Sequence, residues 1–147
     1  MWLVLTAISV VVVVLAVVLW IKRSKLRVKE EMEAHSITAE ALHESLASDK
    51  KLLIYDVRQP LDLLAYPEII PGAKRISPKE ILENPALIPK EKDAVVYCTC
   101  PSDRTSRAIL ERALKLHFDK IKLLKGGLAG WKANGYPVEP YRQVIQL

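Results

Sequence analysis

Residues 95–106 read VVYCTCPSDRTS and decide the fold of this chain. An apolar strand pattern ends at Cys98, a short polar loop follows, and a helical pattern begins near Arg104. The backbone N–H groups of such a loop, and of the helix after it, carry partial positive charge and favour a bound anion. They also favour a cysteine thiolate, which is the nucleophilic form, over the thiol. The stretch therefore predicts an anion cradle with a nucleophilic cysteine at its base.

Strand and helix patterns alternate on both sides of this stretch. Short apolar strands are predicted at residues 51–55, 74–76, 94–98 and 121–124, and helices are predicted to begin near Thr38, Ser77, Arg104 and Leu128. Such alternation indicates a parallel sheet that helices cover on both faces. We therefore predict an α/β fold with a small parallel β-sheet flanked by helices. Ligands bind beyond the carboxyl ends of such strands, where Asp56 and Cys98 are placed.

The N-terminal run differs in character from the rest of the chain. Residues 2–21 contain no charged residue and no proline, and Trp2 and Trp20 lie at the two ends. A helix over these residues is about 30 Å long, the thickness of a bilayer core. A buried core helix and a cleaved signal peptide are the alternatives, but Lys22 and Arg23 stand where a cleavage site would follow. We therefore expect one transmembrane helix, at residues 1–21, before the α/β domain.

Charge predicts how this anchor is oriented. The formal net charge of +5 is matched by a basic cluster at Lys22, Arg23, Lys25, Arg27 and Lys29. Positive residues stay on the cytoplasmic side, so the N-terminus is expected outside and the domain in the cytoplasm, at a bacterial inner membrane. No basic stripe interleaved with aromatic residues indicates nucleic-acid binding.

Composition suggests four segments along the chain. They are a transmembrane anchor at 1–21, a charged juxtamembrane stalk at 22–35, an α/β domain at 36–140 and a tail at 141–147. The two cysteines, Cys98 and Cys100, are too close for a useful structural disulfide. One C-x-C pair cannot fill a zinc site either. No metal and no cofactor are expected.

Four motifs, in order, resemble the rhodanese-like family of single-domain sulfurtransferases. They are Asp56-Val57-Arg58, Ile70-Pro71-Gly72-Ala73, the strand running into Cys98, and Gly126-Gly127-Leu128 with Trp131, Gly135, Tyr136 and Pro137. The resemblance covers roughly residues 36–140 and implies a rhodanese fold. Two departures stand out: Glu68-Ile69 replaces the family's Gly-His, and no residue of the loop at 99–103 is glycine.

The resemblance implies a set of site residues around the loop. Cys98 is the favoured nucleophile because the strand end fixes the floor of the cradle, and Arg104 is expected to attract an anionic substrate. Cys100 is a resolving thiol or an alternative nucleophile. Asp56 and Arg58 are expected to support the site structurally. The anion-binding loop is expected to include Thr99, Ser102, Asp103, Thr105 and Ser106.

Sulfur transfer is the expected function. The cysteine would take sulfane sulfur from a small anionic donor, carry it as a persulfide and pass it to a thiol acceptor. Two alternatives remain. The spacing from Cys98 to Arg104-Thr105 also resembles the Cys-x5-Arg signature of cysteine-dependent phosphatases and rhodanese-fold arsenate reductases. The missing loop glycine and Pro101 favour instead a non-catalytic, membrane-tethered binding module. The sequence identifies no protein partner.

Overall fold

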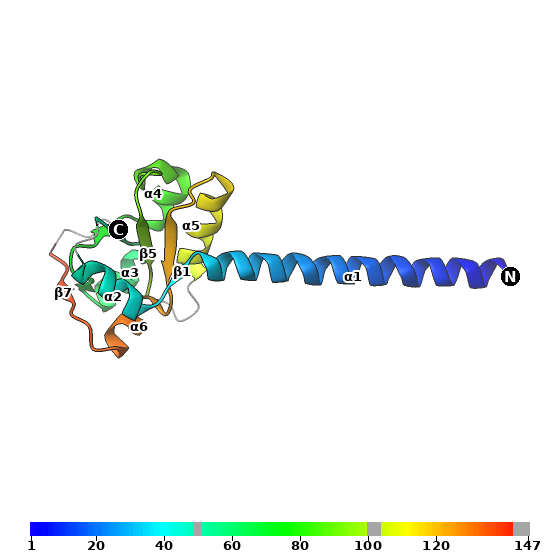
Figure 1. Ribbon diagram of the computed structural model, residues 1–147, viewed down its shortest axis with the longest axis horizontal. Coiled ribbons are helices and arrows are strands. Elements are labelled where there is room, and N and C mark those ends of the chain that lie inside the picture. Colours follow the sequence, from blue (N-terminus) through cyan, green and yellow to red (C-terminus); the bar gives the residue numbers. More distant parts are fainter. Residues whose placement is uncertain (49–50, 100–103, 143–147) are drawn as a thin grey trace. The chain divides into compact units, whose positions relative to one another are not determined.

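The computed structural model of the protein describes residues 1–48, 51–99 and 104–142, and the chain divides into two compact units, residues 1–34 and 35–147. The first unit is a single helix, α1 (Trp2–Ala34), drawn in blue in Figure 1. Its valine and leucine side chains from Val10 to Leu15 are exposed. The helix continues without a break into the charged residues that follow the apolar run.

The transmembrane helix predicted at residues 1–21 is not supported by this structure. Within the described part of the chain, no helix combines the length and the apolarity that a membrane crossing requires. The prediction treats the apolar run as an element of its own. In the structure that run belongs to a longer helix, which also contains the charged residues from Lys22 to Glu33.

The second unit is built on a parallel sheet of short strands. Its five strands run in the order β1 (Ser36–Ile37), β6 (Ile121–Leu124), β5 (Ala94–Tyr97), β2 (Leu53–Asp56) and β4 (Lys74–Arg75). Every neighbouring pair is parallel, with Val95 opposite both Ile54 and Lys122. A separate antiparallel pair joins β3 (Glu68–Ile69) to β7 (Glu139–Pro140). The predicted α/β fold with a parallel sheet is therefore confirmed.

Helices cover both faces of the sheet (Figure 1). The helices are α2 (Ala39–Ala47), α3 (Pro60–Ala65), α4 (Pro78–Glu83), the 3-10 turn η1 (Pro85–Leu87), α5 (Arg104–Lys115) and α6 (Gly127–Ala133). On one face, Leu42 of α2 and Trp131 of α6 join a core cluster with Val95 and Tyr97. On the other face, α5 packs against β5 and β6.

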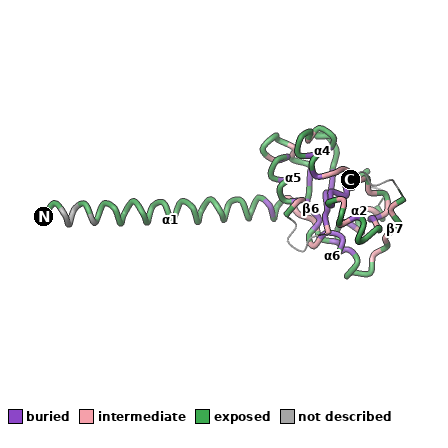
Figure 2. Tube along the Cα trace, turned by 180° about the vertical axis from the view of Figure 1, so that it is seen from behind, coloured by how far each residue is buried: buried purple, intermediate pink, exposed green. Residues whose placement is uncertain are grey.

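The central strand β5 is buried along its whole length. All four of its residues, from Ala94 to Tyr97, are buried. Figure 2 draws buried residues in purple and shows them gathered in the strands at the centre of this unit. A strand covered on both faces has no solvent side, so its sequence is a continuous apolar run rather than an alternating one. This burial explains why the run ending at Cys98 is so readily recognised in the sequence.

Two helix starts form as their sequences predict. The Thr38 hydroxyl accepts a hydrogen bond from the Ala41 N–H at the start of α2, at 3.2 Å. At α4, the Ser77 hydroxyl accepts from the Glu80 N–H while the Glu80 carboxylate accepts from the Ser77 N–H, which is a complete capping box. These hydrogen bonds lower the pKa of Glu80 below its usual value.

A tight glycine turn places the first turn of α6 against the end of β5. Gly126 has φ +73°, and a Cβ at this position would lie 3.2 Å from the Gly130 Cα. Both the left-handed backbone and the close approach therefore require glycine. The turn brings the Leu128 N–H to 2.9 Å from the Cys98 carbonyl.

We expect Gly126→Ala to destabilise the domain more than Gly135→Ala. Gly135 has the same φ of +73°, but a methyl group at its Cβ position would meet no other atom within 4 Å. Both variants bear the left-handed strain of about 1–2 kcal/mol, and only the first also forces the Gly126–Gly130 contact apart. Urea unfolding followed by tryptophan fluorescence measures the two losses. Equal losses would contradict the packing argument.

Candidate functional site

Cys98 directly follows β5 at the carboxyl edge of the sheet and is buried, with 1% of its surface exposed. Two backbone hydrogen bonds hold the chain there. The Leu128 N–H donates to the Cys98 carbonyl at 2.9 Å, and the Val57 N–H donates to the Tyr97 carbonyl at 2.9 Å. The backbone is thus fixed at the point where strand becomes loop, which is where the sequence places the base of the cradle.

Helix α5 begins at Arg104, shortly after Cys98 in the sequence. Its buried face consists of Ser106, Ile109, Leu110 and Ala113. These positions lie on one side of an α-helix, and they pack α5 onto the sheet. Arg104, the first residue of the helix, is exposed, and Thr105 is half-buried. The N-terminus of α5, which carries partial positive charge, thus comes shortly after Cys98 in the sequence.

Two hydroxyl groups beside the loop are buried and unsatisfied. Of the side chains that the structure describes, Thr99 Oγ1 and Ser106 Oγ are buried without a hydrogen-bond partner. Such a group costs about 1–3 kcal/mol unless something bound at the site satisfies it. Thr99 follows Cys98 and Ser106 lies in the first turn of α5, so both hydroxyls flank the expected cradle. The other predicted site residues, Cys100, Ser102 and Asp103, lie outside the described residues.

Asp56, the last residue of β2, forms a fully buried ion pair with Arg58. Both side chains have an exposed fraction of 0%, and the Arg58 Nε lies 2.9 Å from each carboxylate oxygen of Asp56. The same guanidinium also donates to the backbone carbonyls of Tyr66 and Glu68. The pair therefore anchors the segment after α3 to the carboxyl edge of the sheet.

Tyr97 joins this network through its hydroxyl. The phenol donates to the Asp56 Oδ2 at 3.2 Å and accepts from the Ile70 N–H at 3.1 Å. Burial, and then the negative charge of Asp56, raise the pKa of Tyr97 far above its usual range. The phenol therefore stays protonated, and it ties the residue before Cys98 to the segment that follows β3.

A small apolar pocket opens beside Thr99. Its volume is about 360 Å³, and it is lined by Tyr66, Thr99, Leu128, Ala129 and Lys132. Tyr66 is the residue whose carbonyl Arg58 holds, and Leu128 is the residue whose N–H holds Cys98. The pocket therefore adjoins the chain segment that carries the cysteine.

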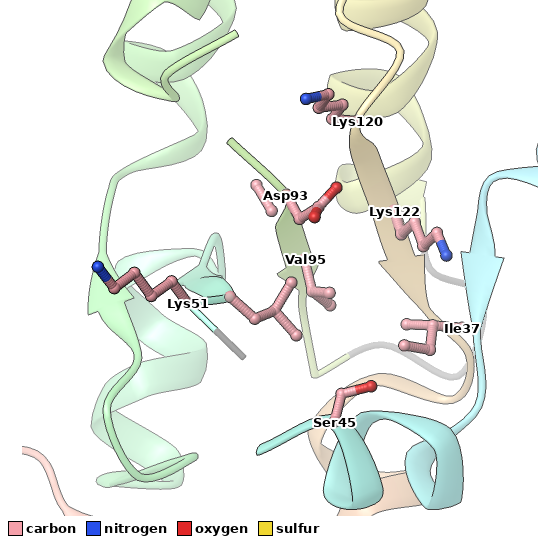
Figure 3. A pocket seen from close by; sticks show the side chains of 9 residues that line it. Ile37, Ser45, Lys51, Asp93, Val95, Lys120 and Lys122 are labelled. Atoms are coloured by element: carbon pink, nitrogen blue, oxygen red, sulfur yellow. The ribbon is translucent and has the colours of Figure 1, made fainter. Parts of the chain in front are cut away.

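A second hollow, of about 380 Å³, lies at the opposite edge of the sheet. Lys51, Lys120 and Lys122 surround it, with Asp93 and Val95 between them, as Figure 3 shows. These residues precede or begin the strands, whereas Cys98 follows β5. Ligands of parallel sheets bind at the carboxyl ends of the strands, so the catalytic candidate is the edge at Cys98.

Comparison with known proteins identifies the family. The model of the rhodanese-like domain matches residues 38–134. The chain belongs to the rhodanese-like family. A protein named sulfurtransferase from Allochromatium vinosum is 27% identical over 104 residues, which cover 71% of this chain and 94% of that protein.

Solved rhodanese-like structures have the same fold. A rhodanese-related protein from Thermoplasma volcanium is 28% identical, has a TM-score of 0.60, and the match covers 71% of this chain and 97% of that one. The Alr3790 protein from Anabaena sp. is 30% identical, with a TM-score of 0.59 and coverage of 71% and 82%. The family indicated by the four motifs is therefore confirmed.

Several residues described above have weaker sequence signals than the four motifs. The sequence indicates only core packing for Tyr97, yet its hydroxyl bridges Asp56 and Ile70. A buried tyrosine at the end of an apolar strand, where phenylalanine would pack as well, indicates a polar partner. Nothing in the sequence places Tyr66 or Lys132 near the cysteine, because no motif includes them.

Replacing Arg58 by methionine should destabilise the domain by about 3–5 kcal/mol, because Asp56 would remain as a buried, unpaired charge. Arg112→Met is the matched control, since Arg112 is exposed on α5. It should change the free energy of unfolding by less than about 0.5 kcal/mol. Tryptophan fluorescence during urea unfolding reports on Trp131, because Trp2 and Trp20 are already exposed. Equal effects of the two variants would contradict a structural role for Arg58.

Tyr97 should also make stability depend on alkaline pH. Its pKa is raised in the folded state, so its contribution is fully present below the unfolded pKa of about 10 and is lost as the pH rises above that value. Above about pH 10 the free energy of unfolding should fall by about 1.4 kcal/mol per pH unit on account of this residue. Tyr97→Phe should remove that part of the slope. An unchanged slope in urea unfolding at several pH values would refute the assignment.

Proposed function

We propose that the protein is an active sulfurtransferase in which Cys98 carries the transferred sulfur as a persulfide. One observation carries this proposal: Cys98 is held at the carboxyl end of the central strand, immediately before the segment that leads to the N-terminus of α5. The named sulfurtransferase relative, of which the match covers 94%, supports the same reaction class.

The reaction would proceed in two displacement steps. In the first, the Cys98 thiolate attacks the outer sulfur of a donor such as thiosulfate, the S–S bond of the donor breaks, and sulfite leaves with the electron pair. In the second, an acceptor thiolate or cyanide attacks the outer sulfur of the persulfide, and the Cys98 thiolate leaves. Neither step needs an external oxidant or reductant, because the sulfane sulfur passes from one nucleophile to the next and the leaving group keeps the electron pair.

The residues around Cys98 have distinct roles in this scheme. The N-terminus of α5 stabilises the negative charge of the thiolate and of the persulfide. Arg104, exposed at the start of that helix, attracts the anionic donor. The unsatisfied hydroxyls of Thr99 and Ser106 supply hydrogen bonds to the bound anion. Asp56 and Arg58 act through structure, because their charged groups are already paired with each other.

Intact mass of the full-length chain tests the proposal. After incubation with thiosulfate in the absence of reductant, the wild-type protein should gain one sulfur atom and lose it again when cyanide is added. Cys98→Ser should gain none, because serine does not form a persulfide. Cys100→Ser is the matched control and should gain sulfur as the wild type does.

Two other outcomes would contradict the proposal. A gain that disappears in Cys100→Ser and persists in Cys98→Ser would move the nucleophile to Cys100. No gain in any form would reject sulfur transfer from thiosulfate and favour the binding-module interpretation, with phosphate-ester and arsenate assays as the next test of the Cys-x5-Arg spacing.

A further inference from the structure

The pocket beside Thr99 is larger and more apolar than an inorganic sulfur donor requires. Tyr66, Leu128 and Ala129 are among the residues that line it, and its volume is about 360 Å³. Pockets of this size and character bind organic molecules through their apolar surface, with a few polar groups fixing the orientation. Thiosulfate offers no apolar surface to such a wall.

The charge of the residues that line the pocket also favours an apolar group over an inorganic anion. Among the described residues that line it, Lys132 alone carries a charge, and its ammonium is paired with the Glu68 carboxylate. The described lining of the pocket therefore offers no uncompensated charge to an anionic group. Arg104, at the positively charged N-terminus of α5, is not among the described residues that line this pocket.

Hydrogen bonds also fix the positions of two residues that line the pocket. Arg58 donates a hydrogen bond to the Tyr66 carbonyl at 2.9 Å, so the buried ion pair fixes the residue that forms one wall. Leu128, which also lines the pocket, donates its N–H to the Cys98 carbonyl. The pocket and the candidate nucleophile thus share their supports, and a molecule bound in the pocket lies beside the segment that carries Cys98.

We propose that this pocket binds the apolar body of an organic sulfane-sulfur donor, such as an aryl thiosulfonate, and so makes the protein favour such donors over small ones. This inference rests on the proposed sulfurtransferase function. The anionic sulfur end lies toward Cys98 and the N-terminus of α5, and the ring lies against Tyr66 and Ala129. The Thr99 hydroxyl, which has no partner within the described structure, donates to the anionic end.

The chemistry is balanced without a further reactant. The Cys98 thiolate attacks the terminal sulfur of the thiosulfonate, the S–S bond breaks, and the sulfinate leaves with the electron pair. A Cys98 persulfide and a free sulfinate result. Because the organic group leaves as the sulfinate, the pocket is vacated after each transfer and is open to the acceptor.

The test compares two donors that share the reacting group but differ in their apolar body. Benzenethiosulfonate and methanethiosulfonate are used with the full-length chain, cyanide is the acceptor, and kcat/KM is measured from thiocyanate formation. The ratio of the two values is then compared between variants, which cancels the difference in intrinsic reactivity. Ala129→Asp places a charge on the apolar wall and should lower the ratio about tenfold, mainly through the KM of benzenethiosulfonate.

Two further variants keep the result interpretable. Ala133→Asp is the matched control, because Ala133 is exposed one turn further along α6 and does not line the pocket. It should leave the ratio within about twofold of the wild-type value. Tyr66→Ser removes the aromatic wall while its backbone carbonyl stays available to Arg58, and it should lower the ratio as Ala129→Asp does.

The outcomes distinguish a failure of the pocket inference from a failure of the proposed sulfurtransferase function. If thiosulfate forms the Cys98 persulfide but the ratio is unchanged in Ala129→Asp and Tyr66→Ser, the pocket inference is overturned and the proposed function stands. If no donor forms a persulfide on the wild-type chain, both are overturned. An equal fall in Ala133→Asp would attribute the effect to surface charge and would also reject the pocket.

Discussion

The buried ion pair between Asp56 and Arg58 is the interaction on which the carboxyl edge of this domain depends. Taking two charges out of water is costly, and the cost is met only where further hydrogen bonds satisfy both groups. Here the guanidinium also holds the carbonyls of Tyr66 and Glu68, and the carboxylate accepts from Tyr97. One pair thereby fixes the segment after α3, the start of β3 and the strand that leads to Cys98.

Much of this architecture could be predicted from local sequence. The run from Ala94 to Tyr97 is apolar because β5 is covered on both faces, and Ser77 with Glu80 forms the capping box that its spacing indicates. Gly126 marks a turn whose left-handed backbone conformation favours glycine. Each of these features depends on residues within a few positions of one another, so the sequence pattern and the structure coincide.

What the sequence does not predict depends on distant contacts or on very short elements. The strands β1, β3 and β7 have two residues each, too few to show a period. The wall at Tyr66 is placed by Arg58, and the hydroxyl of Tyr97 finds Ile70 far away in the chain. The helix α1 is the reverse case. Its local apolar pattern is strong, but the membrane-spanning role that this pattern predicts is not supported by the structure.

The hydrogen bond from Leu128 to Cys98 has a consequence for the order in which the protein is made. Synthesis delivers β5 and its cysteine well before the glycine turn that begins α6, and β1 waits still longer for its neighbour β6 than β5 does. A nascent chain that has just exposed Cys98 therefore lacks the partners on one side of that strand. Contacts of such long sequence separation form late and slowly. Cys98 thus emerges from the ribosome before β6 and α6, and the hydrogen bond from Leu128 to its carbonyl can form only when the last third of the chain is made.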